Sequence, residues 1–223
     1  MLLIAGGVLD DAALAWALAE IEALDWRPGH ETAGPAAREV KRNEQADLTS
    51  ARGQALEAFV RKRILSHPIV ALAARPRRLS RLLLSRTDVG GGYGPHVDNA
   101  LMGGEDARLR SDLSFTLFLT PPDAYDGGAL RIHAPLQDTE IRLPPGDLIL
   151  YPSGAVHEVT TVERGRRLAF VGWIESQVRD PSAREVLWDL EQARAAWPAA
   201  HDPAGRMALD KAIGALLRRW AAS

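Results

Sequence analysis

Four side chains stand in an order and at spacings that could build a metal site with an anion-binding group beside it. His96 and Asp98 lie two residues apart in the segment 93–99, which follows three consecutive glycines. If this segment is extended, side chains at i and i+2 point to the same face, so the imidazole and the carboxylate converge. His157 follows Asp98 by 59 residues, and Arg167 comes ten residues later. We expect His96, Asp98 and His157 to bind one metal ion.

Two neutral imidazoles and one carboxylate suit a particular kind of metal chemistry. Such a set occupies one face of an octahedron around ferrous iron and leaves three positions open for a bidentate cosubstrate and dioxygen. A structural zinc site would instead complete its coordination with four protein ligands. The open half of the coordination sphere is what makes this arrangement suitable for catalysis.

Arg167 is suited to hold an anion next to such a metal. Its guanidinium is always charged and presents a planar fork that matches a carboxylate. A desolvated arginine inside a barrel needs an anionic partner to offset the cost of burial, and a carboxylate cosubstrate would supply one. Alternation along the strand would then turn Arg166 outward, while Ala169 and Val171 point inward with Arg167.

These residues need a β-rich framework to position them, and the chain from Leu79 onward has that texture. Residues 112–120 alternate between apolar side chains on one face and Ser114, Thr116 and Phe118 on the other, which is typical of a barrel wall. About seven short strands favour a sandwich or jelly roll over alternating strand–helix units. They are expected at 79–86, 112–120, 129–133, 139–143, 147–151, 156–162 and 167–175.

Helices are expected before this framework. Asp10 or Asp11 can cap a helix that runs to Leu24, and Thr49 or Ser50 can open a second one over residues 55–66. Between them, residues 27–38 are rich in Gly, Pro and Ala and are expected to form a loop. A short helical piece is expected at 69–74, and the arginine cluster at 75–81 is expected to be solvated.

Two further helices are expected after the framework, at 181–197 and 203–220. Their apolar faces could pack on the barrel or on a second copy of the chain, so a homodimer is one expectation. The predicted organisation is an α+β fold. It comprises a domain at 1–177, with N-terminal helices and a jelly-roll core from about 79, and a helical region at 178–223.

The bulk composition excludes several classes of protein. The chain has 223 residues, 46% of them hydrophobic, which is enough for a real core. Because it has no cysteine, disulfides, cysteine nucleophiles and iron–sulfur clusters are excluded. A net charge of -2 does not indicate nucleic acid or an anionic membrane as a partner. No signal peptide or membrane span is evident, so a cytoplasmic protein is expected.

The chain resembles a known family in the segments that carry these residues. It is similar to the 2-oxoglutarate- and iron(II)-dependent dioxygenases of the prolyl/lysyl hydroxylase-like group, and within them to the bacterial PKHD-type hydroxylases. The resemblance covers about half of the chain, in order and spacing. The matching segments are YGPHVDNA (93–100), SFTLFLT (114–120), YDGGAL (125–130), LPPGDLILYPSGAVHEV (143–159), RGRRLAFVGWIES (164–176) and VRDPSARE (178–185).

This resemblance implies a double-stranded β-helix with flanking helices. It implies that His96, Asp98 and His157 bind iron(II) and that Arg167 pairs with the distal carboxylate of 2-oxoglutarate. The implied reaction hydroxylates an unactivated C–H bond with dioxygen and yields succinate and carbon dioxide, with L-ascorbate as a reductant. The family usually has a tyrosine about nine residues before the first iron ligand, and this chain has Thr87 there.

Several neighbours of the site have more than one interpretation. Tyr93 and Tyr151 could hydrogen-bond the cosubstrate or could be core aromatics with a hydrated hydroxyl. Asn99 could brace Asp98 or form a turn. The glycines 90–92 could give the backbone freedom near the pocket mouth or make an ordinary flexible hairpin.

Two other functions remain as alternatives. The first is a cupin-like metal-binding jelly roll that acts as a sensor or in iron homeostasis, although a pure sensor has no need of Arg167. The second is an interaction protein whose barrel supports the C-terminal helices. For an enzyme, the substrate is left open between a prolyl or lysyl side chain of a protein, a free amino acid and a small metabolite.

Overall fold

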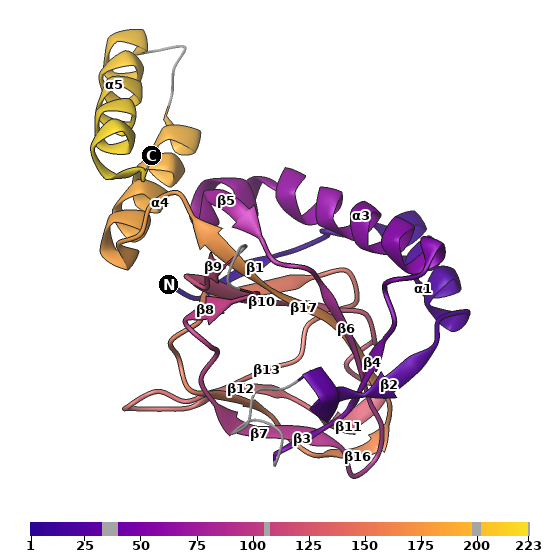
Figure 1. Cartoon of the computed structure of the whole chain (residues 1–223). Helices are drawn as coiled ribbons and strands as arrows, with labels where there is room; N and C mark the ends of the chain where they lie inside the picture. The colour runs from indigo at the N-terminus through magenta and orange to yellow at the C-terminus, as the bar shows by residue number, and fades with distance from the viewer. Residues whose placement is uncertain (33–39, 105–107, 198–201, 223) are drawn as a thin grey trace.

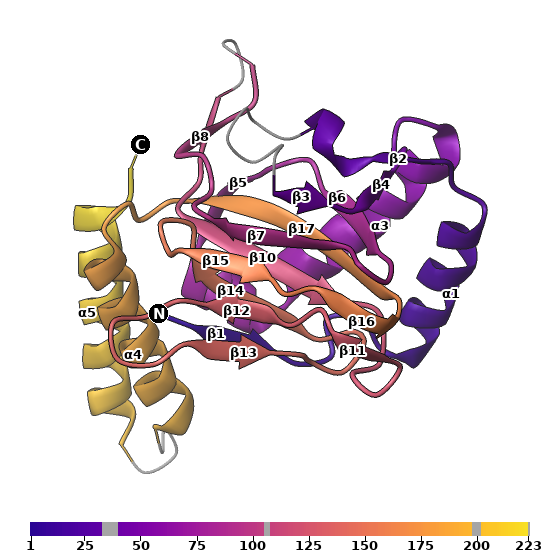
Figure 2. The same cartoon turned by 90° about the horizontal axis from the view of Figure 1, so that it is seen from below.

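The framework consists of two antiparallel sheets that face each other (Figures 1 and 2). The computed structural model describes residues 1–32, 40–104, 108–197 and 202–222. In these ranges the larger sheet has the order β1-β14-β10-β17-β6-β4-β2, with β5 also paired to β17, and the smaller one has the order β13-β12-β15-β7-β3. The predicted jelly-roll core of an α+β protein is confirmed.

The strands of the larger sheet are β1 (Leu3–Ala5), β2 (Trp26–Pro28), β4 (Glu44–Ala46), β5 (Pro76–Leu79), β6 (Leu83–Thr87), β10 (Leu113–Phe118), β14 (Leu148–Pro152) and β17 (Arg167–Ser176). Those of the smaller sheet are β3 (Lys41–Arg42), β7 (Gly92–His96), β12 (Leu130–Ile132), β13 (Thr139–Ile141) and β15 (His157–Val159). Two short pairs complete the described strands: β8 (Leu101–Met102) with β9 (Leu109–Arg110), and β11 (Tyr125–Gly127) with β16 (Val162–Gly165).

The alternation along β10 separates the core from the interior of the jelly roll. Leu113, Phe115 and Leu117 belong to the main hydrophobic cluster. Ser114 and Thr116 are buried as well, but they line a cavity between the sheets. Since successive side chains of a strand point to opposite faces, the same strand closes the core on one side and supplies hydroxyl groups to the cavity on the other.

Helices α1 (Asp11–Glu22) and α3 (Ala51–Ser66) cover the outer face of the larger sheet (Figure 1). The Asp10 side chain accepts a hydrogen bond from the Ala13 N–H at 2.8 Å, and the Ser50 hydroxyl accepts one from the Gly53 N–H at 3.1 Å. Both caps were among the predicted ones, because each satisfies an otherwise unpaired amide of the first turn. α3 begins four residues earlier than predicted because its cap is at Ser50.

The prediction of a loop at 27–38 is wrong for the part that the structure describes; residues 33–39 lie outside it. Residues 26–28 form β2, and Gly29–Thr32 form the short 3-10 helix η1. The strands β3 and β4 that follow were also not predicted. Their segment is too polar to suggest strands, and its conformation depends on pairing with β7 and β6. Tertiary context here outweighs local strand propensity.

The expectation of a solvated arginine cluster at 75–81 is wrong for Arg75. This residue follows the π-helical turn η2 (Val70–Ala74) and pairs with Glu191 at 2.9 Å, with only 10% and 4% of the two side chains exposed. Arg78 is exposed, as expected, although it pairs with the buried Glu175. The buried Arg75–Glu191 pair ties the C-terminal part of the chain to the segment that follows η2.

The two C-terminal helices are α4 (Pro181–Ala196) and α5 (Pro203–Trp220), close to their predicted bounds. They pack on each other through a cluster of their own that includes Leu187 and Ile213. Figure 1 shows this pair at one end of the molecule, with α5 farther from the sheets than α4. Among the described residues, no helix is both long and apolar enough to cross a bilayer.

Removal of the Glu191 carboxylate should destabilise the protein strongly. Glu191→Ala leaves the charge of Arg75 buried without its partner, and breaking a buried pair in this way costs about 3 to 5 kcal/mol of unfolding free energy. Urea unfolding of the purified variant measures the loss. Asp189→Ala, an exposed position on the same helix, is the control and should change the free energy little. An equal, small effect of both substitutions would contradict the prediction.

Candidate active site

The two histidines lie opposite each other on neighbouring strands of the smaller sheet. β7 and β15 are antiparallel, and their register pairs His96 with His157. Residues opposed in this way have Cβ atoms about 5 Å apart on one face, and the two imidazole centroids are 4.3 Å apart. His96 is the last residue of β7, and Asp98 lies just beyond the end of this strand.

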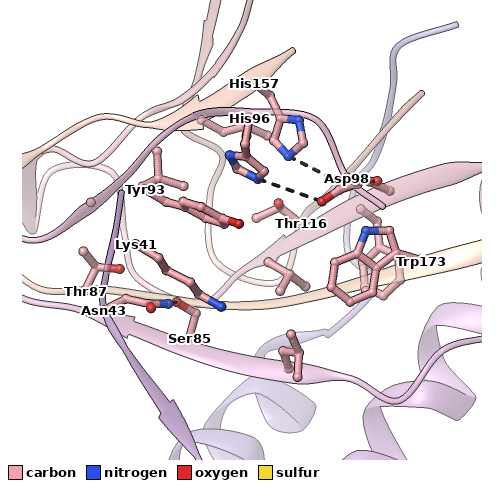
Figure 3. A pocket seen from close by; sticks show the side chains of 18 of the residues that line it. Lys41, Asn43, Ser85, Thr87, Tyr93, His96, Asp98, Thr116, His157 and Trp173 are labelled. Carbon is pink, nitrogen blue, oxygen red and sulfur yellow. Dashed lines mark hydrogen bonds and ion pairs between the residues drawn. The ribbon is translucent and has the colours of Figure 1, made fainter. Parts of the chain in front are cut away.

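The three side chains converge on one point (Figure 3). The Nε2 atom of His96 lies 3.9 Å from Oδ1 of Asp98, and Nε2 of His157 lies 3.7 Å from Oδ2. One candidate ligand atom from each residue lies within 4.8 Å of the others. The set therefore has the composition and spacing to hold a metal ion.

The backbone determines which nitrogen of each histidine is available. Nδ1 of His96 lies 2.8 Å from the carbonyl oxygen of Gly94, and Nδ1 of His157 lies 3.0 Å from that of Ala155. A carbonyl oxygen can only accept, so each Nδ1 carries the proton and donates it. Both Nε2 lone pairs are then free and point toward Asp98, which is the arrangement that a metal ligand needs.

Asp98 is held by serines rather than by Asn99. The Ser114 hydroxyl donates to Oδ2 of Asp98 at 2.6 Å and lies 2.8 Å from the hydroxyl of the buried Ser153. Since Ser114 has one proton, which goes to the carboxylate, Ser153 donates to Ser114. Asn99 accepts a hydrogen bond from the Ser111 hydroxyl through its backbone oxygen. Ser114 and Ser153 thus fix the carboxylate.

Burial also sets the protonation state of the first histidine. Desolvation, followed by the neighbouring His157, lowers the pKa of His96 to about 4, although Gly94 and Asp98 act in the opposite direction. The imidazole is therefore neutral near pH 7. Neutral imidazole is the form that binds a metal.

The convergent groups line a cavity of about 460 Å³ between the two sheets. This size lies within the range of about 300 to 1,000 Å³ that is usual for small-molecule sites. Its wall includes residues from the smaller sheet, among them Tyr93, and from the larger sheet, among them Ser85, Arg167 and Trp173. The cavity can therefore hold a small molecule against the three converging side chains.

Arg167 points into the interior, as predicted. Its side chain is fully buried, and its Nε and Nη2 atoms have no hydrogen-bond partner among the described residues. Burial lowers the pKa of Arg167, while the nearby Tyr125 and Tyr151 act in the opposite direction. Arg166 points outward and pairs with Asp88 at 2.6 Å, as the alternation predicted. An unpaired buried guanidinium fits an anionic ligand in this cavity.

Both candidate tyrosines line the cavity, and so does Thr87. The Tyr93 ring stacks on His96 with 3.6 Å between centroids and 15° between planes. The Tyr151 ring meets His157 edge-on at 5.0 Å, and its pKa is raised by burial. Thr87 is the Cα partner of Arg167 on the neighbouring strand, so a small side chain stands opposite Arg167 in register.

Two of the three glycines of the loop are required for close packing, and the third for its backbone conformation. A Cβ at Gly91 would lie 2.6 Å from the Arg42 carbonyl oxygen, and one at Gly92 would lie 2.9 Å from that of Val159. Among these three glycines only Gly90 has a positive φ, of 81°. The loop therefore lets β7 approach both β3 and β15.

The sequence interpretation missed one wall of the cavity. Lys41, Asn43 and Gln45 alternate along β3 and β4 and all line the cavity. Because all five residues of 41–45 are polar, the sequence shows no alternation that would mark this segment as a strand with one face toward a cavity.

The sequence of the chain is similar to that of known iron-dependent oxygenases. A model of the 2OG-Fe(II) oxygenase superfamily matches residues 82–175. A PKHD-type hydroxylase of Hyphomonas neptunium is 40% identical over 215 residues, which cover 96% of each chain. A PKHD-type hydroxylase of Synechococcus elongatus is 42% identical over 221 residues, covering 99% of each chain.

Solved structures show the same fold at low sequence identity. A prolyl hydroxylase of Trichoplax adhaerens, in complex with a peptide fragment of the hypoxia inducible factor oxygen degradation domain, has a TM-score of 0.59 at 16% identity. The alignment covers 85% of this chain and 86% of that one. A viral collagen prolyl hydroxylase from Paramecium Bursaria Chlorella virus-1, a 2OG complex, has a TM-score of 0.54 at 15% identity, covering 78% and 96%.

The cavity lysine should titrate far below an ordinary lysine. Burial lowers the pKa of Lys41 to about 8, with Asp98 acting in the opposite direction. Its ammonium should lose its charge as the pH rises through 8, whereas a lysine in water does so at about 10.4. Since the folded value is the lower one, the free energy of unfolding should rise with pH across this window.

Because the chain has only three lysines, NMR of the reductively ¹³C-dimethylated protein can follow each amine separately. The Lys41 signal is assigned as the one missing from Lys41→Arg. A midpoint above 10 for this signal would contradict the prediction.

Proposed function

Because this chain belongs to the PKHD-type hydroxylase family of the 2OG-Fe(II) oxygenase superfamily, we propose a role for each residue of its site. The chain is an iron(II)- and 2-oxoglutarate-dependent dioxygenase. His96, Asp98 and His157 bind iron(II), and Arg167 binds the distal carboxylate of 2-oxoglutarate. The observation that carries the proposal is the convergence of two backbone-oriented Nε2 atoms and one carboxylate in a cavity that also contains a buried, unpaired arginine.

Iron(II) with bound 2-oxoglutarate supplies the activation of dioxygen that ends in hydroxylation of an unactivated C–H bond, with succinate and carbon dioxide as co-products. The protein supplies binding, orientation and exclusion of water. Ser114 holds the Asp98 carboxylate in one orientation, and the stacked Tyr93 ring fixes the plane of His96. His157 is almost fully buried, which limits the access of water to the metal side of the cavity.

Arg167 fixes the position of the distal carboxylate of 2-oxoglutarate. Its guanidinium has two nitrogens without partners, and a carboxylate can accept from both in a bidentate contact. Tyr151 and Thr87 line the same cavity, Tyr151 against His157 and Thr87 opposite Arg167 in strand register. We assign Tyr151 and Tyr93 to cosubstrate contact or to the pocket wall, and Thr87 leaves space that the usual tyrosine would fill.

Further parts of the proposal rest on family membership or on the sequence alone. They are a cytoplasmic location, L-ascorbate as the reductant that restores oxidised iron, and a homodimer. We also propose the division into a dioxygenase domain at 1–177 and a helical region at 178–223, supported by the separate hydrophobic cluster of the C-terminal helices.

Removal of one iron ligand should abolish both metal binding and turnover. His96→Ala or Asp98→Ala leaves two of the three ligand groups, so we expect no stoichiometric binding of iron(II) and no succinate above background. Anaerobic iron(II) titration and a succinate assay with 2-oxoglutarate measure the two effects. Ser182→Ala, on the exposed start of α4, is the control. Iron-dependent turnover of 2-oxoglutarate that persists in both ligand variants would refute the assignment.

Loss of Arg167 should act on the cosubstrate. Arg167→Ala removes charge-assisted hydrogen bonds worth about 3 kcal/mol in total, so the 2-oxoglutarate concentration needed for half-maximal turnover should rise on the order of 100-fold. Arg166→Ala is the matched control, because this neighbour has the same chemistry on the outer face of the strand. Similar shifts for both variants would exclude a specific role for Arg167.

A further inference from the structure

A third tyrosine lies beside Arg167 and has no role in the function proposed above. Tyr125 is fully buried on β11, at the start of the segment 125–130 that matches the family pattern. Its hydroxyl makes no well-aligned hydrogen bond within the described residues. A buried hydroxyl without a partner costs free energy, so Tyr125 differs from an ordinary core aromatic.

The Tyr125 hydroxyl and the Arg167 guanidinium are electrostatic neighbours. The Nε and Nη2 atoms of Arg167 are also buried and lack a hydrogen-bond partner in the part of the chain that the structure describes. Arg167 borders the cavity, whereas Tyr125 is not part of its lining, so the tyrosine lies behind the guanidinium as seen from the cavity. Two unsatisfied polar groups thus meet where the distal carboxylate of the cosubstrate is proposed to bind.

The backbone fixes Tyr125 next to the start of β17. β11 pairs with β16, and the register places Tyr125 opposite Gly165, two residues before Arg167. A Cβ at Gly165 would lie 2.2 Å from the Ala124 carbonyl oxygen, and one at Gly128 would lie 3.1 Å from an atom of the Tyr125 ring. These two glycines therefore let the chain close tightly around the tyrosine, and its place beside Arg167 follows from the strand pairing.

The other aromatic neighbours of Arg167 do not orient its guanidinium by hydrogen bonding. The guanidinium carbon lies 5.3 Å from the centroid of the Phe118 ring, which attracts a cation but has no polar atom. The Tyr151 hydroxyl interacts with Thr116 instead. Tyr125 therefore brings a hydroxyl that has no other engagement.

The donor and acceptor types of the two groups decide how they interact. A guanidinium has only donors, so the phenol oxygen of Tyr125 must accept from it. Burial raises the pKa of Tyr125, with Arg167 acting in the opposite direction, so the hydroxyl keeps its proton near pH 7. A neutral phenol does not cancel the charge of Arg167. Tyr125 can therefore direct the guanidinium without replacing its anionic partner.

We propose that Tyr125 is a positioning residue that accepts a hydrogen bond from the rear of the Arg167 guanidinium and turns its free N–H groups toward the distal carboxylate of 2-oxoglutarate. This inference rests on the proposed function and adds a residue to the same site. The contact between the two side chains becomes well aligned when the carboxylate draws the guanidinium into place. The preference for a 2-oxo acid that carries a distal carboxylate then depends on both residues together.

The first experiment measures cosubstrate binding without turnover. The full-length protein is loaded anaerobically with iron(II), and the visible charge-transfer band is followed during titration with 2-oxoglutarate or with 2-oxopentanoate, which has the same keto acid but no distal carboxylate. Tyr125→Phe removes the hydroxyl alone. It should weaken the binding of 2-oxoglutarate about tenfold, because it removes one hydrogen bond to a charged group, and should leave the binding of 2-oxopentanoate unchanged.

Unchanged binding of 2-oxoglutarate in Tyr125→Phe would overturn the inference. Equal weakening for both acids would also overturn it, because the hydroxyl would then support the site in general rather than the distal carboxylate. If the wild-type protein shows no band with 2-oxoglutarate, the proposed function itself fails. This outcome is distinct from a band that the substitution does not affect.

The second experiment asks whether Tyr125 acts through Arg167. Tyr125→Phe, Arg167→Ala and the double variant form a double-mutant cycle for 2-oxoglutarate affinity. Residues that act as a unit are not additive, so Tyr125→Phe should change the affinity by less than about twofold once Arg167 is alanine. If the two losses multiply instead, the hydroxyl acts independently of Arg167 and the assignment is wrong.

Arg142→Ala is the matched control for a neighbour of Tyr125. Arg142 is exposed and contacts the backbone oxygen of Tyr125 at 3.4 Å, so its removal leaves the hydroxyl in place and should leave 2-oxoglutarate affinity unchanged. Iron(II) affinity without cosubstrate should be the same in Tyr125→Phe and in the wild type. A loss of iron(II) affinity in Tyr125→Phe would contradict the inference, and circular dichroism confirms that each variant is folded.

Discussion

The register between β7 and β15 is the constraint on which the whole site depends. It places His96 directly opposite His157, although 61 residues separate them in the chain. Because side chains alternate along a strand, a slip of one residue would turn one of the two imidazoles to the other face of the sheet. The carbonyl oxygens of Gly94 and Ala155, two residues before each histidine, then orient both rings in the same way. Pairing of the backbone thus sets both the position and the tautomer of the ligands.

The larger sheet contributes what the smaller sheet lacks. β10 supplies Ser114, which holds Asp98, and β17 supplies Arg167. Both strands are central in their sheet and are packed on their outer side against the main core. A charged guanidinium inside the jelly roll is desolvated at a cost that an anionic ligand in the cavity would offset. The Tyr125 hydroxyl is a neighbour of this guanidinium, so a hydroxyl reaches it from β11 although position 87 lacks the tyrosine.

The sequence predicted the parts of the fold and site that depend on local pattern. Strict alternation in 113–118 was enough to assign the two faces of β10, although Phe115 of the core face also borders the cavity and Phe118 of the other face belongs to a second hydrophobic cluster. Asp10 and Ser50 were each one of two predicted helix caps. His96, Asp98, His157 and Arg167 stood out because their residue types have few other uses at those spacings. The interior direction of Arg167 followed from counting along one strand.

Features that depend on distant pairing were not predictable in this way. β3 and β4 have little strand propensity of their own and are ordered by β7 and β6, so the sequence did not indicate that Lys41 lies on a strand. The contact from Ser114 to Asp98 joins two sheets, and no local rule distinguishes it from a contact with the adjacent Asn99. Arg75 resembled a member of a solvated cluster because its acidic partner, Glu191, lies far along the chain.

Burial has opposite consequences for the two kinds of basic side chain in the cavity. Desolvation lowers the pKa of His96 to about 4, so the imidazole is neutral near pH 7 and is in the form that binds a metal. The same effect lowers the pKa of Arg167, but a guanidinium keeps its charge near neutral pH. Its burial is therefore compensated only when an anion is bound. One dry cavity thus keeps the imidazole ready for a metal and makes the arginine depend on an anionic ligand.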